Sequence, residues 1–411
     1  MNVPETQFDD SLSATTVPTE EAVGGFAADT EVMTTGGPVC VGELTTEDQV
    51  YALDPTTQLV KVKPVRATER CRVTELVEIR TRRANLRVTP DHPIVYRTKS
   101  IAQPRFTRAG DLTEREYYQF INQWRRPSRE PRSEIDITDL TDEYQACVTR
   151  SMHGHTFRAA LPDGCEPIYR SRDVGYCFDA ETFKRFQSKL EALGDAVAVR
   201  AKRGHRPQPY RFDADAFIQF IGWFVSEGSI HRSADRETSE VQIAQEKSNH
   251  RRTIRALFEE LGFDVSIDDR SFSFGSYLYG QLLGRLCGRR SSERRLPEFV
   301  WELSRGQQRL LLEVLLDGDG NEQRTYYTAS DQLAGDILRL CLELGIKPRY
   351  SFRRGTWQVF VNAVNDGFVA SNHVKRISTS ASVYRVTVED YTTVMAGKNG
   401  RFQWVGTSRV V

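Results

Sequence analysis

Hydrophobic and polar residues alternate over short stretches near both ends of the chain. Between residues 25 and 124 such stretches predict antiparallel strands, separated by Asp-Pro, Pro and polar clusters: VYALD, LVKVKPV, LVEIRTR, LRVTP and PIVYR. The pattern returns near the C-terminus in VYRVTVEDYTTVMAG and RFQWV, around a Gly-Lys-Asn-Gly turn at 397–400. Both ends of the chain are therefore expected to be rich in β-strands.

The centre of the chain has a different pattern. It follows the basic, proline-containing stretch RRPSREPRS at 125–133. Farther on, ETFKRFQSKLEALG at 181–194 shows helical spacing with a glycine stop. From about residue 125 we expect mixed α and β structure.

An internal repeat organises this centre. Each unit begins with an apolar helix that ends in an acid and a glycine: FIQFIGWFVSEG reaches the acid Glu227, and LLLEVLLDGDG reaches Asp319, 92 positions later. Each unit continues with an amphipathic helix that ends in Leu-Gly, within 248–263 and 330–346, and then with a strand-like segment. Two copies of one folding unit predict pseudo-twofold symmetry.

The two acids suggest a shared chemistry. Helices that are apolar around most of their circumference should be buried, and small residues such as Ser226 and Gly318 let two helices approach closely. The glycine after each acid can end its helix in a left-handed turn, so parallel helices would present Glu227 and Asp319 side by side. Adjacent carboxylates repel unless cations lie between them, and Mg²⁺ takes oxygen ligands. The pair therefore predicts metal-dependent phosphodiester hydrolysis.

At these residues the sequence resembles the two-motif LAGLIDADG homing endonucleases, over about residues 210–376. The resemblance implies a monomer with an αββαββα-type, pseudo-twofold domain whose strands straddle double-stranded DNA above the motif helices. It also implies Mg²⁺ as the cofactor, with Mn²⁺ as a substitute. Glu227 and Asp319 match the metal-binding acid that ends each motif, and Gly222 matches the helix-contact glycine of the first. Val314 replaces that glycine in the second motif, which predicts a slightly wider separation of the helices.

Two basic residues are candidate catalytic helpers. Arg294 lies in RRLP, which resembles the Lys-x-Ile-Pro stretch that supplies such a helper in intein endonucleases. Arginine does not readily release its proton, so only charge stabilisation is expected from it. Lys375 is the corresponding candidate for the second unit. A solvated surface charge is the alternative for both residues.

Arginine clusters interleaved with aromatic residues are the candidate DNA contacts. In strands, alternation would direct one set of side chains to the DNA and the other to the core. The candidate arginines are Arg251, Arg252, Arg285, Arg289, Arg290, Arg295, Arg349, Arg353 and Arg354.

The strand-rich ends resemble the Hint fold of inteins and Hedgehog autoprocessing domains. Residues 25–37 look like the opening intein block, 88–96 like the Thr-x-x-His block, and YRVTVEDYTTVMAGKNGRFQWVGTS like the closing blocks. The resemblance implies that an endonuclease is inserted between the two halves of this domain.

Residues needed for splicing are missing from this frame. An intein starts the reaction with Cys or Ser at its first position, which is Gly25 here, and ends it with an Asn where this chain has Thr407. Thr89, His92 and the downstream nucleophile Ser408 are retained. We therefore expect an intein-like domain that does not splice, in which His92 has a structural role.

Residues 125–209 are predicted to form a DNA-recognition insert. Their place between the Hint-like part and the nuclease resembles that of a module found in some intein endonucleases. Zinc could use the cysteines and histidines of this region, but no CxxC pair is present and the spacings fit no common finger. Core thiols and surface histidines are the alternative.

These patterns together predict a multidomain α+β protein. An all-β Hint-like domain is formed by both chain ends, 25–124 and 377–411, with the insert at 125–209 and the endonuclease domain at 210–376 between them. Residues 1–24 are rich in Thr, Ser and acid, which predicts a flexible acidic tail.

Charge and composition refine this picture. The chain has 56 basic and 56 acidic residues, but residues 1–49 hold ten of the acids and no Lys or Arg, so the rest carries a net charge of +10. A basic body is typical of nucleic-acid binders. No apolar run approaches the ~20 residues of a membrane span, and the N-terminus lacks the pattern of a secretory signal. We expect a cytoplasmic protein without membrane association, from a prokaryote or encoded by a phage or virus.

The sequence thus predicts a site-specific homing endonuclease that makes metal-dependent double-strand breaks in a long DNA target, beside an intein-like domain that does not splice. The alternative function is that of a non-cleaving DNA- or RNA-binding protein of the same family, acting as a regulator or a maturase-like splicing helper.

Overall fold

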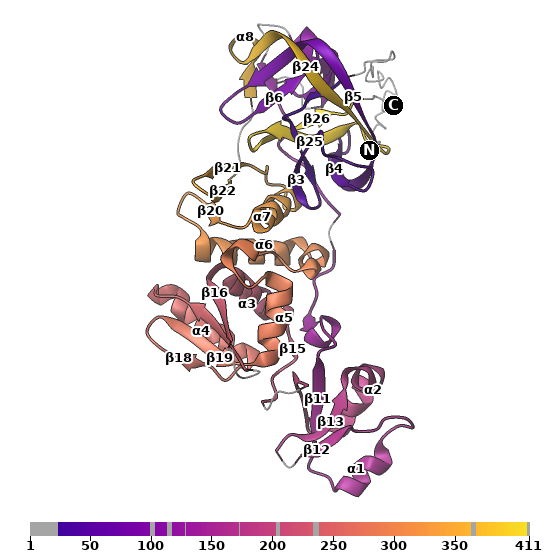
Figure 1. Ribbon diagram of the computed structural model, residues 1–411, viewed down its shortest axis with the longest axis vertical. Helices are drawn as coiled ribbons and strands as arrows, with labels where there is room; N and C mark the ends of the chain where they lie inside the picture. The colour runs from indigo at the N-terminus through magenta and orange to yellow at the C-terminus, as the bar shows by residue number, and fades with distance from the viewer. Residues whose placement is uncertain are drawn as a thin grey trace, which may run out of the picture. The chain divides into compact units, whose positions relative to one another are not determined.

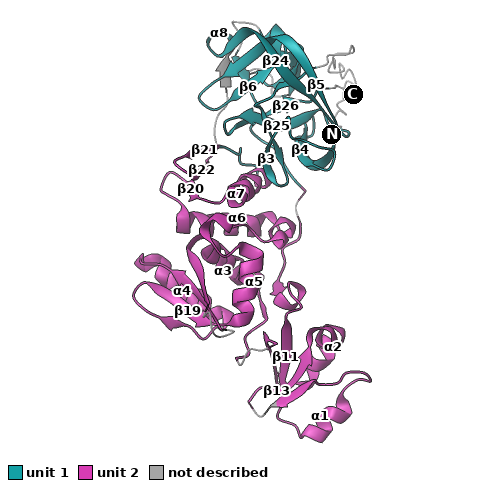
Figure 2. Ribbon diagram, in the orientation of Figure 1, with its two compact units in different colours: residues 1–126, 345–349, 363–411 teal, residues 127–344, 350–362 magenta. Residues whose placement is uncertain are grey.

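The structure is a computed structural model that describes residues 24–98, 103–112, 117–127, 129–171, 173–202, 206–232, 238–362 and 367–408. The chain divides into two compact units (Figure 2): unit 1 comprises residues 1–126, 345–349 and 363–411, and unit 2 comprises residues 127–344 and 350–362. Helices and large sheets both occur, so the predicted α+β class is confirmed. The predicted acidic tail lies outside the described residues except for Gly24. Among the described helices, none is long and apolar enough to cross a membrane.

Unit 1 consists mainly of antiparallel strands (Figure 1). From the N-terminal part of the chain come β1 (Phe26–Ala27), β2 (Glu31–Thr34), β3 (Gly37–Cys40), β4 (Gln49–Asp54), β5 (Leu59–Arg80), β6 (Asn85–Val88), β7 (Pro93–Tyr96), β8 (Arg105–Arg108) and β9 (Tyr117–Gln119). From the C-terminal part come β23 (Gly367–Val369), the short helix α8 (Ala370–His373), β24 (Val374–Val388), β25 (Thr393–Lys398) and β26 (Arg401–Gly406).

Strands from both ends of the chain share one sheet. Its order is β24-β1-β6-β5-β4-β2-β25-β26, with β3 paired to β2, and β7–β8 and β9–β23 form two separate pairs. Its core buries Phe26, Val50, Val77, Val88 and Val394, all of which have no exposed side-chain surface. The strands that the alternating pattern predicted at the two ends therefore fold together, as the resemblance of both ends to one domain implied.

One strand boundary was predicted wrongly. LVKVKPV and LVEIRTR are parts of the single 22-residue strand β5 rather than two strands. The polar stretch between them, residues 66–75, pairs with β24 and leaves many of its side chains exposed, so its polarity reflects solvent contact and not a turn. Pro64 lies opposite Gln49, at the end of the β4 ladder, where a strand tolerates a missing N–H donor.

The predicted turn at 397–400 is confirmed. Lys398 pairs with Arg401 at the end of the β25–β26 ladder. Asn399 and Gly400 between them have φ values of 53° and 69°. Positive φ at both central residues is the mark of a two-residue hairpin turn.

The two sequence repeats lie in unit 2. The first forms α3 (Ala214–Glu227), β16 (Gly228–Arg232), β17 (Ser239–Ala244), α4 (Ser248–Leu261), β18 (Ser266–Ile267), β19 (Ser271–Gly275) and α5 (Tyr277–Cys287). The second forms α6 (Arg305–Asp319), β20 (Thr325–Thr328), α7 (Asp331–Glu343), β21 (Tyr350–Arg353) and β22 (Thr356–Phe360). The sheet orders are β16-β17-β19-β18 and β20-β22-β21.

The residues between the N-terminal strands of unit 1 and the repeats form their own sheet, also in unit 2. The elements are β10 (Glu134–Asp136), β11 (Tyr144–Thr149), α1 (Gly154–Ala160), β12 (Tyr169–Ser171), β13 (Gly175–Asp179), α2 (Ala180–Leu193), β14 (Ala196–Ala201) and β15 (Arg211–Asp213). The sheet has the order β12-β13-β11-β14, and β10 pairs with β15. Helix α2 confirms the predicted helix at 181–194. We refer to residues 134–202 as the insert.

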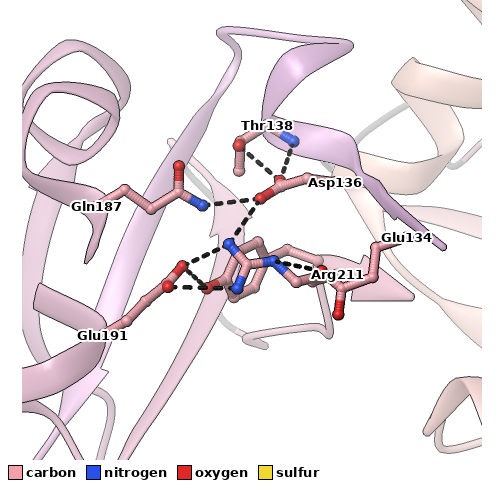
Figure 3. Close-up of polar contacts among 7 residues, drawn as sticks. Glu134, Asp136, Thr138, Gln187, Glu191 and Arg211 are labelled. Carbon is pink, nitrogen blue, oxygen red and sulfur yellow. Dashed lines mark hydrogen bonds and ion pairs between the residues drawn. The ribbon is translucent and has the colours of Figure 1, made fainter. Parts of the chain in front are cut away.

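Charged side chains connect the insert to the strand that precedes α3 (Figure 3). Arg211 of β15 donates to Glu191 of α2 at 2.8 and 3.3 Å and to Asp136 of β10 at 3.3 Å. Asp136 also accepts a hydrogen bond from Gln187 at 2.7 Å, and Tyr210 donates to Glu191 at 2.6 Å. Burial alone would raise the pKa of Glu191, but the bonds from Tyr210 and Arg211 lower it. The network joins α2 to β15, which leads directly into α3.

The predicted domain limits and the two compact units divide the chain differently. Residues 345–349 and 363–376 fall within the predicted endonuclease region but belong to unit 1. Strand β24 begins at Val374, so the predicted limit at 376 lies inside a strand.

Candidate active site

Helices α3 and α6 pack against each other at residues that are 92 positions apart. Near their beginnings, Gln307 Nε2 donates to Asp215 Oδ1 at 3.0 Å. Near their ends, a methyl group placed on Gly318 would lie 2.5 Å from Ser226 Cβ. Because the beginnings meet and the ends meet, the helices are parallel, and their contact follows the pseudo-twofold symmetry that the repeat predicted.

The middle of this helix contact is formed by Gly222 and Val314. A methyl group on Gly222 would lie 2.7 Å from Val314 Cγ1. The valine side chain therefore occupies the space that the glycine leaves. This explains how the second motif accommodates a larger residue at the position where the first has glycine.

Both helices end at the predicted acids, Glu227 and Asp319, but the predicted left-handed caps are wrong. Gly228 has φ −82° and ψ 154°, and Gly320 has φ −96° and ψ 171°, which is extended backbone. A methyl group on either glycine would lie 2.3 Å from the carbonyl oxygen four residues earlier. Each chain turns sharply out of its helix, so glycine is needed for close backbone approach and not for a positive φ.

The two acids lie in a partly buried environment at this end of the helix pair. Burial, and secondly the charge of Glu227, raises the pKa of Asp319 to about 7. Burial also raises the pKa of Glu227, against the opposing charge of Lys247. The buried hydroxyl of Tyr326 lies 3.5 Å from Asp319 Oδ2 and 3.4 Å from Ser226 Oγ. The site thus combines both helix ends with the first strand of the second repeat.

The carboxylate pair fits a hard divalent cation that is shared with a substrate. Mg²⁺ is commonly held by one or two carboxylates and completes its shell with phosphate and water oxygens. A cation would also remove the repulsion that raises the pKa of Asp319. Within the described residues, no group of three or more His, Cys, Asp or Glu side chains could hold a metal, and this includes the cysteines and histidines of the insert. Glu227 and Asp319 supply two carboxylates, and other ligands would have to come from water or a substrate.

Arg294 lies beside the pair, but its guanidinium is buried. It donates to the carbonyl oxygen of Gly288 at 2.6 Å and to that of Gly228, and it lies 4.8 Å from the centre of the Phe224 ring. Its charge partly offsets the upward shift in the pKa of Asp319. With 6% of its surface exposed, Arg294 is not a solvated surface charge. It fixes the start of β16, directly after Glu227.

Two residues that the sequence reasoning missed hold Arg294 in place. Ser330 Oγ donates to the carbonyl oxygen of Arg294 at 2.6 Å. The carboxylate of Asp336 accepts from the backbone N–H of Leu296 at 2.8 Å, and burial raises its pKa to about 6. Ser330 caps α7, the amphipathic helix of the second repeat, and Asp336 lies in the N-terminal half of that helix. An acid on the buried face of this helix is the signal in the sequence that could have indicated them.

Lys247 is a further residue that the sequence reasoning missed. It directly precedes α4, is exposed, and its charge acts on Glu227. Ser330 occupies the equivalent place before α7, so alignment of the repeats would have indicated this position. The proposed helper Lys375 lies on β24 of unit 1, opposite Glu78, and does not belong to the unit that contains the acids.

The candidate DNA-contacting arginines have different environments. Four donate hydrogen bonds within unit 2: Arg251 to Gln245 and Asp268, Arg285 to Leu140, Arg289 to Gln281, and Arg295 to Arg285. Arg285, Arg289 and Arg295 of this group are nevertheless exposed. Arg252, Arg290, Arg353 and Arg354 are exposed as well, and Arg290 forms an ion pair with Glu293. Arg349 belongs to unit 1, where it forms a β-bridge with Arg401. The exposed set contains the arginines best placed to meet a ligand.

Neutral polar residues dominate the outward face of the first repeat's sheet. Gln242 points away from the buried neighbours on β17 and contacts His231 at 3.0 Å and Ser271 at 2.8 Å. The aromatic residues Phe272 and Phe274 of β19 are buried, as the alternation predicted. The candidate arginines Arg251 and Arg252 lie on α4 and not on the strands of this sheet.

The predicted splicing positions of unit 1 lie together. The backbone N–H of Gly25 donates to Thr89 Oγ1 at 3.0 Å, and Thr89 N donates to the Gly25 carbonyl at 3.0 Å. The backbone of Thr407 pairs with Thr392 at 2.7 Å, and Ser408 Oγ accepts from Val386 at 2.8 Å. Gly25, Thr89, Thr407 and Ser408 were named from the sequence as splicing positions.

His92 lies between the two ends of this arrangement. Its ring is fully buried and packs 4.4 Å from the centre of the Phe26 ring, and a methyl group on Gly24 would lie 2.8 Å from its Nδ1. Burial lowers its pKa to about 3, and the nearby backbone of Gly406 partly offsets this shift. The imidazole is therefore neutral and touches both the Gly24–Gly25 and the Gly406–Thr407 segments.

Comparison with known proteins gives partial matches. No family model matches the chain. It is 37% identical over 95 residues to the DNA gyrase A protein of Mycobacterium gordonae, which covers 21% of this chain and 17% of that protein. It is 33% identical over 161 residues to the DNA gyrase A protein of Mycobacterium kansasii, covering 34% and 28% respectively. The chain thus spans less than a third of the curated relatives that it matches.

Solved structures that match are intein-like. A bacterial intein-like domain from Clostridium thermocellum is 28% identical and aligns with 23% of this chain and 64% of its own, with a TM-score of 0.20. A DnaB intein from Synechocystis is 17% identical and aligns with 24% of this chain and 68% of its own, also with a TM-score of 0.20.

Proposed function

We propose that this chain is a monomeric, metal-dependent DNA endonuclease of the two-motif LAGLIDADG type, inserted in an intein-like domain that does not splice. The observation that carries the proposal is the parallel contact of α3 and α6 at positions 92 residues apart, which brings Glu227 and Asp319 to one end of the helix pair. Two carboxylates on a pseudo-twofold axis match a duplex substrate, in which two strands are related in the same way.

The chain's own residues have distinct roles in this proposal. Glu227 and Asp319 bind Mg²⁺, or Mn²⁺ in its place, through their carboxylate oxygens. When bound, the metal supplies Lewis-acid activation of the attacking water and the scissile phosphate. Tyr326 orients Asp319, and the buried Arg294 holds the backbone that follows Glu227. Lys247 and Arg294 add positive charge that favours a phosphodiester next to the pair.

The intein-like part contributes no reaction in this proposal. Gly25 has no side chain that could attack the preceding carbonyl group, and Thr407 cannot cyclise as a terminal asparagine does. The contacts of Thr89 and His92 then serve to close the domain around Gly25. We therefore expect the purified chain to keep its full mass and to produce no ligated flanks.

The matches to DNA gyrase A proteins indicate a first DNA substrate. A homing endonuclease cuts the uninterrupted copy of the gene in which it resides. We therefore propose a mycobacterial gene for the DNA gyrase A protein, without an insertion, as the target, and a bacterial cytoplasm as the setting.

The test is cleavage of this gene, and of a randomised DNA pool, by the full chain. We expect double-strand breaks that require Mg²⁺ or Mn²⁺ and stop in EDTA. Glu227→Gln and Asp319→Asn should each lower the cleavage rate by more than about 100-fold, because each removes a metal ligand while keeping its shape. Asp317→Asn is the matched control, since this exposed acid lies on the same helix two residues earlier.

Three results would contradict the proposal. One is the absence of any metal-dependent cut in either substrate, and another is full activity of the two acid variants. The third is nucleic-acid binding without cleavage: DNA binding alone would instead support a regulator, and binding of RNA alone would support a maturase-like helper.

A further inference from the structure

Three arginines of the insert gather around one tyrosine. Their guanidinium carbons lie 5.1 Å (Arg150), 5.8 Å (Arg158) and 5.4 Å (Arg170) from the centre of the Tyr176 ring. Arg150 directly follows β11, Arg158 lies on helix α1, and Arg170 lies on strand β12. We call Arg150, Arg158 and Arg170 the arginine cluster.

Packing beneath the cluster fixes its shape. Tyr176 stacks on the buried Phe157 of α1 at 4.7 Å, and its hydroxyl donates to the Gly154 carbonyl at 3.4 Å. Arg170 lies directly opposite Tyr176 in the β12–β13 register. A methyl group on Gly154 would lie 2.8 Å from a terminal nitrogen of Arg150, so the glycine makes room for this guanidinium.

The positive charges of the cluster are not neutralised by the protein. Among the described residues, none of the three arginines forms an ion pair with a carboxylate, whereas Arg211 and Arg324 of the same unit do. Arg158 and Arg170 are exposed and Arg150 is half-buried, with a buried Nε that has no hydrogen-bond partner. Three like charges held this close repel each other, and an anion with several charges would relieve the repulsion.

We propose that the arginine cluster binds the phosphate backbone of duplex DNA. The distances to the Tyr176 centre keep any two guanidinium carbons within about 11 Å of each other. One strand of B-DNA carries a phosphate about every 3.4 Å along the helix axis, so a cluster no wider than this can reach up to about three consecutive phosphates. Contacts of this kind set the position of the protein on DNA and carry no sequence information. The choice of DNA as the ligand rests on the proposed function.

The test is the salt dependence of DNA binding by the full chain. Fluorescence anisotropy with a labelled duplex from the target gene, in EDTA to prevent cleavage, gives the slope of log K against log salt. Replacing Arg150, Arg158 and Arg170 together by Gln should reduce the magnitude of this slope by about 2.7, at about 0.9 for each phosphate contact, and weaken binding about 100-fold at 0.15 M salt. Arg185→Gln is the matched control. Arg185 is exposed on α2 of the same insert, lies 5.1 Å from one ring, and should leave the slope unchanged.

Single substitutions guard against misfolding of the triple variant. Arg158→Gln and Arg170→Gln alter exposed side chains, and each should reduce the slope by about 0.9. The inference is overturned if the slope of the triple variant equals that of the parent, or if Arg185→Gln reduces the slope as much as the triple variant does. It is also overturned if the slope falls for duplex RNA and not for duplex DNA, or if 10 mM inorganic phosphate alone displaces the DNA duplex. If the triple variant keeps the slope of the parent and the parent cleaves DNA, only the role of the arginine cluster is refuted. If the slope falls in the triple variant but the parent cleaves no DNA, only the nuclease function is refuted.

Discussion

Gly318→Ala tests whether α3 and α6 are packed as closely as the acid pair requires. The added methyl group would lie 2.5 Å from Ser226 Cβ and 2.9 Å from its Oγ. Carbon atoms in contact lie about 3.5–4.0 Å apart, so the helices must separate by about 1 Å. Overpacking of this kind costs about 1–3 kcal/mol, and the higher helix propensity of Ala returns about 1 kcal/mol. We expect a net loss of about 1 kcal/mol in the free energy of unfolding.

Two variants provide the controls for this prediction. Gly306→Ala lies on the same helix, and its methyl group would be 3.8 Å from the nearest side-chain atom, so it should be neutral or stabilising. Ser226→Gly removes the obstructing side chain and should restore the stability of Gly318→Ala in the double variant. Urea unfolding followed by tryptophan fluorescence, to which the buried Trp223 of α3 contributes, measures these differences. The reasoning is refuted if Gly318→Ala is as stable as Gly306→Ala, or if Ser226→Gly gives no rescue.

Other predictions concern pH, the buried arginine and the intein-like part. Burial raises the pKa of Asp336 from 3.8 to about 6, so the folded state keeps a proton that the unfolded state loses; stability should fall by about 3 kcal/mol as pH rises between these values. Asp336→Asn should remove this fall in urea unfolding, and equal pH profiles would contradict it. Arg294→Met should lower the free energy of unfolding by about 2–4 kcal/mol, because the carbonyl groups of Gly288 and Gly228 lose their hydrogen-bond donor. Thermal unfolding measures this loss, and an unchanged melting temperature would refute the role of Arg294. Gly25→Cys should let the new thiol attack the Gly24 carbonyl and replace the peptide bond by a thioester, which an added thiol then cleaves to release residues 1–24, as seen by mass spectrometry. The nearest atoms to a methyl group at Gly25 are those of Val383, at 3.0 and 3.2 Å, and Thr89 Cγ2, at 3.6 Å. An intact mass would show that Thr89 and His92 are not arranged for this reaction.

The elements with strong local signals could be predicted from the sequence. Helices α3 and α6 end at the predicted acids because a long apolar run, an acid and a glycine leave few alternatives. The hairpin at 397–400 follows from Asn-Gly, which adopts positive φ at low cost. The repeat also predicted that Glu227 and Asp319 would meet, since two copies of one unit bury equivalent helix faces.

Other features depend on contacts between distant residues and could not be predicted. The single strand β5 forms because β24, some 300 residues later, pairs with its polar middle. The glycines after the acids were assigned to left-handed turns, but the space left by Phe224 and Leu316 decides their conformation. Arginine-rich stretches looked like DNA contacts, yet several of their guanidinium groups bind protein carbonyl groups, which composition does not reveal.

The central claim is that Glu227 and Asp319 are two halves of one metal-binding carboxylate pair. Titration of Mn²⁺ into the full chain with its target duplex, followed by electron paramagnetic resonance, tests it most directly. The account predicts bound Mn²⁺ in the parent protein and in Asp317→Asn, and loss of this binding in both Glu227→Gln and Asp319→Asn. Equal Mn²⁺ binding in all four proteins would contradict it.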